Sequence, residues 1–153
     1  MGQFPDYASK RFLIVDDEVF MLGSVERMLK QCHAALILKA SDGAKALRSI
    51  TDDLTQVDCV ISDFNMKPVN GLQLLQGIRL GINPKIPRDQ PFILLTGNTD
   101  ADVAEAATAL HVNEVLMKPV TPEKLYQTID KVFGRSIALK GADQYRSIKL
   151  PVG

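Results

Sequence analysis

The sequence predicts an α/β domain in which a parallel sheet of five strands is covered by helices on both faces. Short apolar runs alternate along the chain with segments of helical periodicity, which is the order expected for β-α-β units. The apolar runs show little in–out alternation, as expected for strands that are buried on both faces. Polar residues follow directly after four of the runs, and parallel strands would bring these residues to one edge of the sheet.

Each strand candidate is an apolar run of the length that is common for strands. The second candidate, Ala-Ala-Leu-Ile-Leu-Lys, is the least apolar of them. In order along the chain, the predicted strands are residues 11–15, 34–39, 57–62, 91–95 and 113–117.

Helical spacing follows each strand candidate, because apolar residues recur three and four positions apart and so share one helix face. Residues that favour helix starts stand before four of these segments: Ser41 and Asp42, Asn70, Thr99 and Asp100, and Thr121 followed by Pro122. Gly134 is a natural stop for the last one. The predicted helices are residues 18–31, 42–50, 71–80, 100–110 and 122–133.

Right-handed crossovers leave few topologies for five such units, and the flavodoxin-like strand order 2-1-3-4-5 suits five strands best. The ligand crevice of this order lies beyond the carboxyl ends of the strands, near strands 1 and 3. We expect residues 10–133 to form the domain, with residues 1–9 as an N-terminal extension. Residues 134–153 form a C-terminal tail that has no predicted place in the sheet and carries a net charge of about +3.

The composition excludes several classes of protein. The chain is 46% hydrophobic and 24% charged, which is ordinary for a globular domain. Eighteen basic and eighteen acidic residues balance, so the overall charge does not point to nucleic acid. No apolar run approaches the roughly 20 residues needed to cross a bilayer, and the N-terminus lacks signal-peptide features. We therefore expect a cytoplasmic protein without nucleic-acid or membrane partners, in which Cys32 and Cys59 are buried, reduced thiols.

Three carboxylates follow two of the predicted strands. Asp16 and Asp17 end the first, and Asp63 ends the third. Carboxylates held close together raise one another's pKa unless a cation intervenes. A site that offers only oxygen ligands, without His or thiolate, favours a hard ion such as Mg²⁺ or Mn²⁺. Helix capping is the alternative for Asp16 and Asp17, but it does not account for Asp63, which is followed by a loop.

Thr96 and Lys118 occupy the corresponding ends of the fourth and fifth strands. A lysine at a strand end is usually a solvated charge. Here it would point back toward the acidic cluster, where it pairs with a carboxylate or with an incoming phosphoryl group. Thr96, followed by Gly97, would supply one hydroxyl to the same group.

With these residues in view, the chain resembles the receiver domains of bacterial two-component response regulators, in particular the single-domain receivers of the chemotaxis type. The resemblance covers about residues 10–133. Its motifs, in the order and at the spacing of the family, are Leu13–Glu18, Asp63–Met66 with Gly71 eight residues past Asp63, Leu94–Gly97 and Met117–Pro119.

The resemblance implies a role for each residue. Asp63 would be the phosphoacceptor, taking a phosphoryl group from a histidine kinase or a phosphotransfer protein. Asp17 would bind Mg²⁺ directly, Asp16 would help directly or through water, and the backbone carbonyl of Asn65 would be a further ligand. Thr96 and Lys118 would contact the phosphoryl oxygens. Such a protein is a signalling phosphoacceptor rather than an enzyme, and the peptide bond before Pro119 is expected to be cis.

The resemblance also implies that a downstream protein binds the face formed by about residues 99–133. The chain departs from the family at Val115, where an aromatic residue is common, so the aromatic form of the conformational switch is absent. Lys67 intervenes before Pro68 and is expected to face solvent. The C-terminal tail would cover the partner-binding face or extend it toward an acidic partner.

Two other functions remain open at this stage. One is a receiver-shaped adaptor that binds partners regardless of phosphorylation, although such a protein has no need for Asp16, Asp17, Asp63, Thr96 and Lys118 together. The other is a Mg²⁺-dependent phosphohydrolase with an aspartyl nucleophile. It is disfavoured because Asn65 stands where a second acid would protonate the leaving group.

Overall fold

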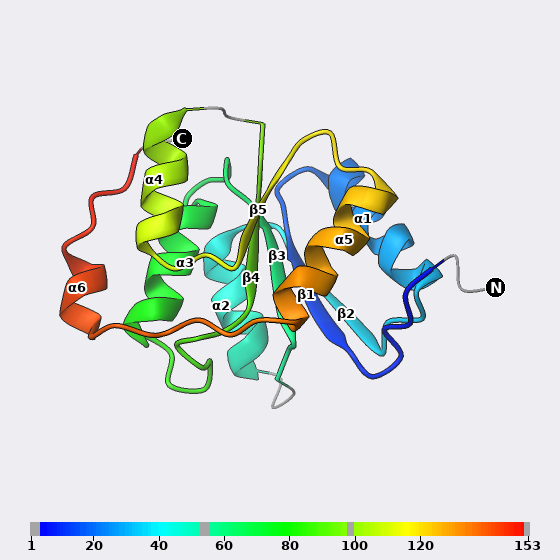
Figure 1. Cartoon of the computed structure of the whole chain (residues 1–153), viewed down its shortest axis with the longest axis horizontal. Coiled ribbons are helices and arrows are strands. Elements are labelled where there is room, and N and C mark those ends of the chain that lie inside the picture. The colour runs from blue at the N-terminus through cyan, green and yellow to red at the C-terminus, as the bar shows by residue number, and fades with distance from the viewer. Residues whose placement is uncertain (1–3, 53–55, 98–99, 152–153) are drawn as a thin grey trace.

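The computed structural model describes residues 4–52, 56–97 and 100–151, except for the side chains of residues 50–52. Its centre is a parallel sheet in the order β2-β1-β3-β4-β5, which confirms the predicted topology (Figure 1). The strands are β1 (Arg11–Val15), β2 (Leu36–Ala40), β3 (Cys59–Asp63), β4 (Phe92–Thr96) and β5 (Glu114–Met117).

Helices cover both faces of the sheet (Figure 1). The five longer helices are α1 (Val19–Gln31), α2 (Gly43–Asp52), α3 (Gly71–Leu80), α4 (Ala101–Ala109) and α5 (Pro122–Phe133). One core cluster joins α1 and α5 to Phe12 and Ile14 of β1. The other joins α2, α3 and α4 to Leu13 and Val15 of the same strand. Successive residues of β1 thus enter opposite cores, which is why the strand is apolar throughout.

Four of the predicted start signals act as caps, namely Asp42, Asn70, Asp100 and Thr121, whereas the Ser41 hydroxyl accepts from the Lys45 ammonium instead. Asn70 and Gln73 form a reciprocal capping box at α3, and the side chain of Thr121 accepts from the Lys124 amide at α5. The Asp42 carboxylate accepts from the Lys45 amide at 2.9 Å. Thr99 lies outside the described residues.

Strand β1 has its predicted bounds, and β5 begins one residue later than predicted and ends where predicted, whereas β2, β3 and β4 both begin and end slightly later than predicted. β2 begins at Leu36 rather than at residue 34, because Ala34 and Ala35 belong to the turn after α1, in which His33 has a φ of 60°. β3 begins at Cys59, although Val57 before it is also buried. β3 and β4 continue to Asp63 and Thr96, so these two polar residues are the last of their strands.

The chain ends take part in the fold more than their sequences indicate. Tyr7 is buried, and its hydroxyl donates to Asp130 of α5 at 3.0 Å. After α5 the tail passes the sheet and forms a short helix, α6 (Ala142–Arg146), beside α3 (Figure 1). Of the expected partner-binding face, residues 99–133, the end of the tail runs beside α4, and α6 lies away from β5 and α5 (Figure 1). Tyr145 of α6 is fully buried.

Cys32 and Cys59 are buried free thiols, as expected. Within the described part of the chain, no helix combines the length and the apolar character that a membrane span needs.

Candidate functional site

Four strand ends bring the sequence-predicted polar residues to one edge of the sheet. The parallel register pairs Val15 with Ser62, Asp63 with Leu95 and Thr96 with Met117, so the strands end level with one another. Each polar side chain therefore leaves its strand at the same height. The residues brought together are Asp16, Asp17, Asp63, Thr96 and Lys118.

The acidic cluster is compact. Asp16, Asp17 and Asp63 each offer an oxygen, and these three atoms lie within 4.8 Å of one another. Asp16 and Asp63 are 1% and 4% exposed, whereas Asp17 is open to solvent. Two buried carboxylates with an exposed third one leave a path by which a hydrated cation reaches the cluster.

Lys118 reaches back over this cluster, as the sequence predicts. Its Nζ lies 2.8 Å from Asp63 Oδ1 and 3.9 Å from Asp16 Oδ2. Burial by itself lowers the pKa of Lys118, but the hydrogen bond and charge of Asp63 outweigh it, and the pKa is raised. The lysine is therefore a fixed cation directed at Asp63.

Both buried carboxyl groups have raised pKa values. Burial is the main cause for Asp63, and the Lys118 ammonium opposes it. For Asp16, burial and then the charge of Asp63 raise the pKa to about 6, against the Glu18 amide, which lowers it. Asp16 thus lacks the full complement of positive charge that a buried carboxylate needs.

One atom shows this lack directly. Among the described residues, Asp16 Oδ2 is the buried side-chain oxygen that has no hydrogen-bond partner. Lys118 Nζ is too far away, at 3.9 Å, to supply one. Such an atom, with two further carboxylates beside it, fits a hard cation.

The capping alternative for Asp16 and Asp17 is not what the structure shows. Glu18 is the N-cap of α1, and no side chain makes a cap hydrogen bond there. Asp16 Oδ1 accepts instead from the Glu18 amide at 2.9 Å, which orients the carboxylate at the end of β1. The geometry assigns this carboxylate to the cluster.

A hollow of about 380 Å³ opens over Asp63. Glu18 and Asn65, which flank the motifs in the sequence, lie at its exposed edge, and Lys67 faces solvent as expected. The hollow is large enough for a phosphoryl-sized group. Its lining residues are Glu18, Asp63, Phe64, Asn65, Thr96, Gly97 and Lys118.

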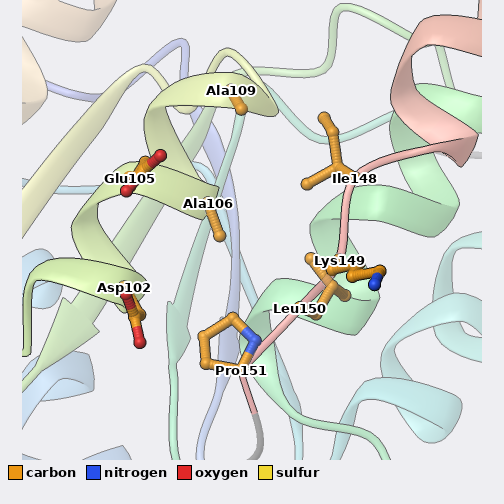
Figure 2. Close-up of a pocket in the computed structure, with 8 residues that line it drawn as sticks. All are labelled: Asp102, Glu105, Ala106, Ala109, Ile148, Lys149, Leu150 and Pro151. Carbon is orange, nitrogen blue, oxygen red and sulfur yellow. The ribbon is translucent and has the colours of Figure 1, made fainter.

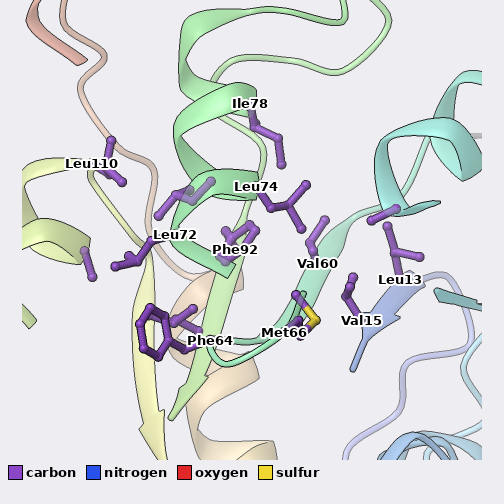
Figure 3. Packing of buried hydrophobic residues seen from close by; sticks show 14 of the residues in the cluster. Leu13, Val15, Val60, Phe64, Met66, Leu72, Leu74, Ile78, Phe92 and Leu110 are labelled. Atoms are coloured by element: carbon purple, nitrogen blue, oxygen red, sulfur yellow. The ribbon is translucent and has the colours of Figure 1, made fainter. Parts of the chain in front are cut away.

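The loop after Asp63 is held by buried residues that the sequence analysis did not single out. Phe64 and Met66 are 2% and 3% exposed and belong to the core cluster that contains Val15 and Val60 (Figure 3). The Phe64 amide donates to the Leu95 carbonyl at 2.8 Å. The sequence carries a signal for this arrangement, because the apolar residues Phe64 and Met66 alternate with the polar residues Asn65 and Lys67.

The contacts of Gly71 explain why the Asp63 motif has a glycine at this position. Its amide donates to the Phe64 carbonyl at 2.9 Å, and a Cβ at this position would lie 2.3 Å from the Asp63 carbonyl oxygen and 2.8 Å from Leu94 Cδ1. Only a residue without a side chain lets α3 begin this close to Asp63. The peptide bond before Pro119 is cis, as expected, and so is the one before Pro68.

Comparison with known proteins agrees with this arrangement. The sequence profile described as the response regulator receiver domain matches residues 12–130. A probable chemotaxis protein CheY of Rhizobium etli is 36% identical over 124 residues, which cover 81% of this chain and 92% of that protein. The transcriptional regulatory protein GlrR of Escherichia coli is 34% identical over 124 residues, but these are 26% of its length.

Solved structures show the same fold. The chemotaxis protein CheY4 of Vibrio cholerae superimposes with a TM-score of 0.72 at 26% identity, covering 80% of this chain and 98% of that one. A response regulator receiver domain protein of Clostridium thermocellum gives 0.71 at 31% identity, covering 82% and 95%. With its fold, its strand-end cluster and its profile match in agreement, this chain belongs to the response regulator receiver domain family.

Proposed function

We propose that this chain is a phosphorylatable receiver of a two-component phosphorelay, in which Asp63 accepts a phosphoryl group and the domain signals by protein–protein contact. The observation that carries the proposal is the placement of Asp63. It is a buried carboxylate at the floor of a phosphoryl-sized hollow, 2.8 Å from a lysine and next to two further carboxylates.

The reaction is a displacement at phosphorus. An Asp63 carboxylate oxygen forms a bond to the phosphorus of a phosphohistidine on the donor protein, and the phosphorus–nitrogen bond breaks with its electron pair going to the imidazole. The Lys118 ammonium and the Thr96 hydroxyl contact the phosphoryl oxygens, on which negative charge is spread. The donor is a histidine kinase or a phosphotransfer protein.

Four groups would hold Mg²⁺, or Mn²⁺ in its place: the carboxylates of Asp16, Asp17 and Asp63 and the backbone carbonyl of Asn65. The unpartnered Asp16 oxygen supports this choice. When bound, the ion neutralises the carboxylates and the phosphoryl oxygens. The chain itself provides Lys118, which favours the ionised form of Asp63 against burial and orients its oxygen, and a hollow that a donor can reach.

The signalling surface would be the face of α4, β5 and α5, about residues 99–133. Two apolar side chains of the edge strand β5, Val115 and Met117, are 38% and 40% exposed on it. An exposed apolar pair on an edge strand suits a protein partner. Phosphorylation would act by favouring one of two arrangements of this face.

Incubation with acetyl phosphate and Mg²⁺, followed by intact-protein and peptide mass spectrometry, tests the proposal. We expect one added phosphoryl group on the peptide that contains Asp63, its loss in Asp63→Asn, and its retention in Asp89→Asn, where an exposed acid elsewhere is changed. No mass gain in the wild-type protein would favour a phosphorylation-independent adaptor. Continuous release of phosphate from phosphoesters over many turnovers would favour a phosphohydrolase.

A further inference from the structure

The C-terminal segment of residues 136–151, called the strap below, lies outside the part of the chain that matches the receiver profile. It leaves α5, passes the sheet, forms α6 beside α3 and then rises next to α4 (Figure 1). α4 is part of the face proposed above for signalling. A segment beyond the profile match is thus placed next to a helix of that face.

Tyr145 anchors the strap in the core. The side chain is 0% exposed and lies in the cluster with α3 and α4 residues. Its hydroxyl accepts from the Lys140 amide at 3.0 Å and is 2.8 Å from Nδ1 of His111, just after α4. Gln76 of α3 donates to the carbonyls of Tyr145 and Ile148 at 2.9 and 3.1 Å. Long-range hydrogen bonds to the strap therefore come from both α3 and the α4–β5 loop.

Two arginines extend this anchor. Arg88 donates to the Lys140 carbonyl of the strap and to the Arg79 carbonyl, each at 2.7 Å. The buried guanidinium of Arg79 donates in turn to the carbonyls of Leu110 and His111, at 2.9 and 2.8 Å. The strap, the end of α3 and the α4–β5 loop are consequently one hydrogen-bonded unit.

Within its nine residues α4 has few large side chains in the core, although its C-cap Leu110 is fully buried. Its nine residues contain one large buried side chain, Val103, and its other buried positions are Ala106 and Ala107. Alanines bury little apolar area, so this helix gains less free energy from packing than α3 does. Its position is set to a greater degree by its neighbours.

The end of the strap runs alongside α4 without filling the space between them. Ile148 and Leu150 pack against the core cluster, and a hollow of about 470 Å³ separates the strap from the exposed side of α4 (Figure 2). α4 therefore has room on this side. The residues that line the hollow are Asp102, Glu105, Ala106, Ala109, Ile148, Lys149, Leu150 and Pro151.

We propose that the strap fixes α4 and the α4–β5 loop in the arrangement seen here, so that the signalling face changes only when the strap loosens. The proposal rests on the proposed receiver function for its biological meaning. Its physical content, that the strap restrains α4, stands on the contacts above. By linkage, a phosphoryl group that favours another position of α4 must also weaken the docking of the strap.

Hydrogen–deuterium exchange on the full-length chain tests the restraint without any phosphodonor. In Tyr145→Ala we expect the exchange rates of the amides of residues 101–112 to rise about tenfold or more. The reason is that α4, once its anchor is removed, opens locally more often. The amides of α1, on the other face of the sheet, serve as the reference and stay unchanged. Freely exchanging strap amides with unchanged α4 amides would overturn the proposal.

A milder variant covers the case in which Tyr145→Ala loosens the whole protein and α1 exchanges faster as well. Ile148→Ser with Leu150→Ser removes two partly buried contacts of the strap and spares the central core. Lys149→Ser, at the exposed position between them, is the matched control. Faster exchange of α4 in the double variant alone supports the restraint, and equal exchange in the double variant and the control refutes it.

A second arm adds acetyl phosphate and Mg²⁺ to the wild-type chain. If the strap and the site are coupled, strap amides and α4 amides exchange faster together once Asp63 carries the phosphoryl group. A change in α4 with unchanged strap amides would refute the coupling. Absence of phosphorylation would instead contradict the receiver function, and the first arm would still decide whether the strap restrains α4.

Discussion

Lys118 Nζ lies 2.8 Å from Asp63 Oδ1 and 3.9 Å from Asp16 Oδ2, so one ammonium interacts with two buried carboxylates but is within hydrogen-bond distance of only one of them. Asp63 receives the hydrogen bond, and Asp16 keeps an unpartnered oxygen and a pKa raised to about 6. The unequal division has two consequences. The Lys118 ammonium favours the charged form of the candidate nucleophile against the opposing effect of burial. A place remains for a second cation beside Asp16.

Replacing Lys118 by Ala should slow the phosphorylation of Asp63 by acetyl phosphate by about 100-fold or more, because a preorganised charge at the transferring group is lost. The rate is measured by mass spectrometry at saturating Mg²⁺. Lys67→Ala is the matched control, since Lys67 is also a lysine near the site but faces solvent. A similar rate in both variants would mean that Lys118 does not contact the transferring group.

Replacing Asp16 by Asn should make the chain less dependent on Mg²⁺ for its stability. The substitution removes a buried charge with an unpartnered oxygen, so we expect the free energy of unfolding without Mg²⁺ to stay equal or rise by about 1 to 3 kcal/mol. The stabilisation that Mg²⁺ adds should shrink, because one ligand is gone. Urea unfolding with and without Mg²⁺ measures both, and equal Mg²⁺ stabilisation in the variant and wild type would contradict the metal assignment.

The residues at the carboxyl edge of the sheet could be predicted from the sequence, because the apolar runs themselves determine where each strand ends. Once the runs are parallel and β3 and β4 are neighbours, Asp63 and Thr96 lie at adjacent strand ends on the same edge of the sheet. The sequence could not decide whether Asp16 caps α1 or joins the cluster, since both environments favour Asp. The structure decides it, because Glu18 is the N-cap and Asp16 lies in the cluster.

The strap shows where sequence reasoning failed. Tyr145 and Ile148 stand three residues apart, but Leu150 does not continue this spacing. Helix α6 has five residues, too few to show a helical period in the sequence. Its partners are distant in the chain: Gln76 lies 69 residues and His111 34 residues from Tyr145. Such pairings depend on the finished fold, in which α3 and the α4–β5 loop already stand side by side.

Replacing Gly71 by Ala should destabilise the domain, because its Cβ would lie 2.3 Å from the Asp63 carbonyl oxygen. Backbone atoms of β3 and α3 must move apart, and we expect a loss of about 1 to 3 kcal/mol in the free energy of unfolding. Urea denaturation measures the loss. Gly141→Ala is the control, since a Cβ there meets no atom within 4 Å, and its φ of −63° suits alanine. Equal stability of the two variants would show that the close approach is not a constraint.

The bond between His111 and Tyr145 should make stability depend on pH. Burial first, and then the positive charges of Lys140 and Arg79, lower the pKa of His111 from its usual 6.5. A neutral ring with its proton on Nε2 accepts the Tyr145 hydroxyl proton at Nδ1, whereas a protonated ring can only donate there and leaves that hydroxyl proton without this acceptor. The Arg88 guanidinium lies over the Tyr145 ring, 5.7 Å from its centroid.

Because the folded state disfavours the proton on His111, this contribution to stability is complete above pH 6.5 and is lost as the pH falls below it. We expect His111→Asn to remove that part of the pH dependence between pH 5 and 8, as measured by urea unfolding. His33→Asn is the matched control, because both histidines have left-handed backbones, with φ of 53° and 60°, which asparagine tolerates. Identical pH profiles for the wild type and His111→Asn would show that the strap is not anchored through a neutral imidazole.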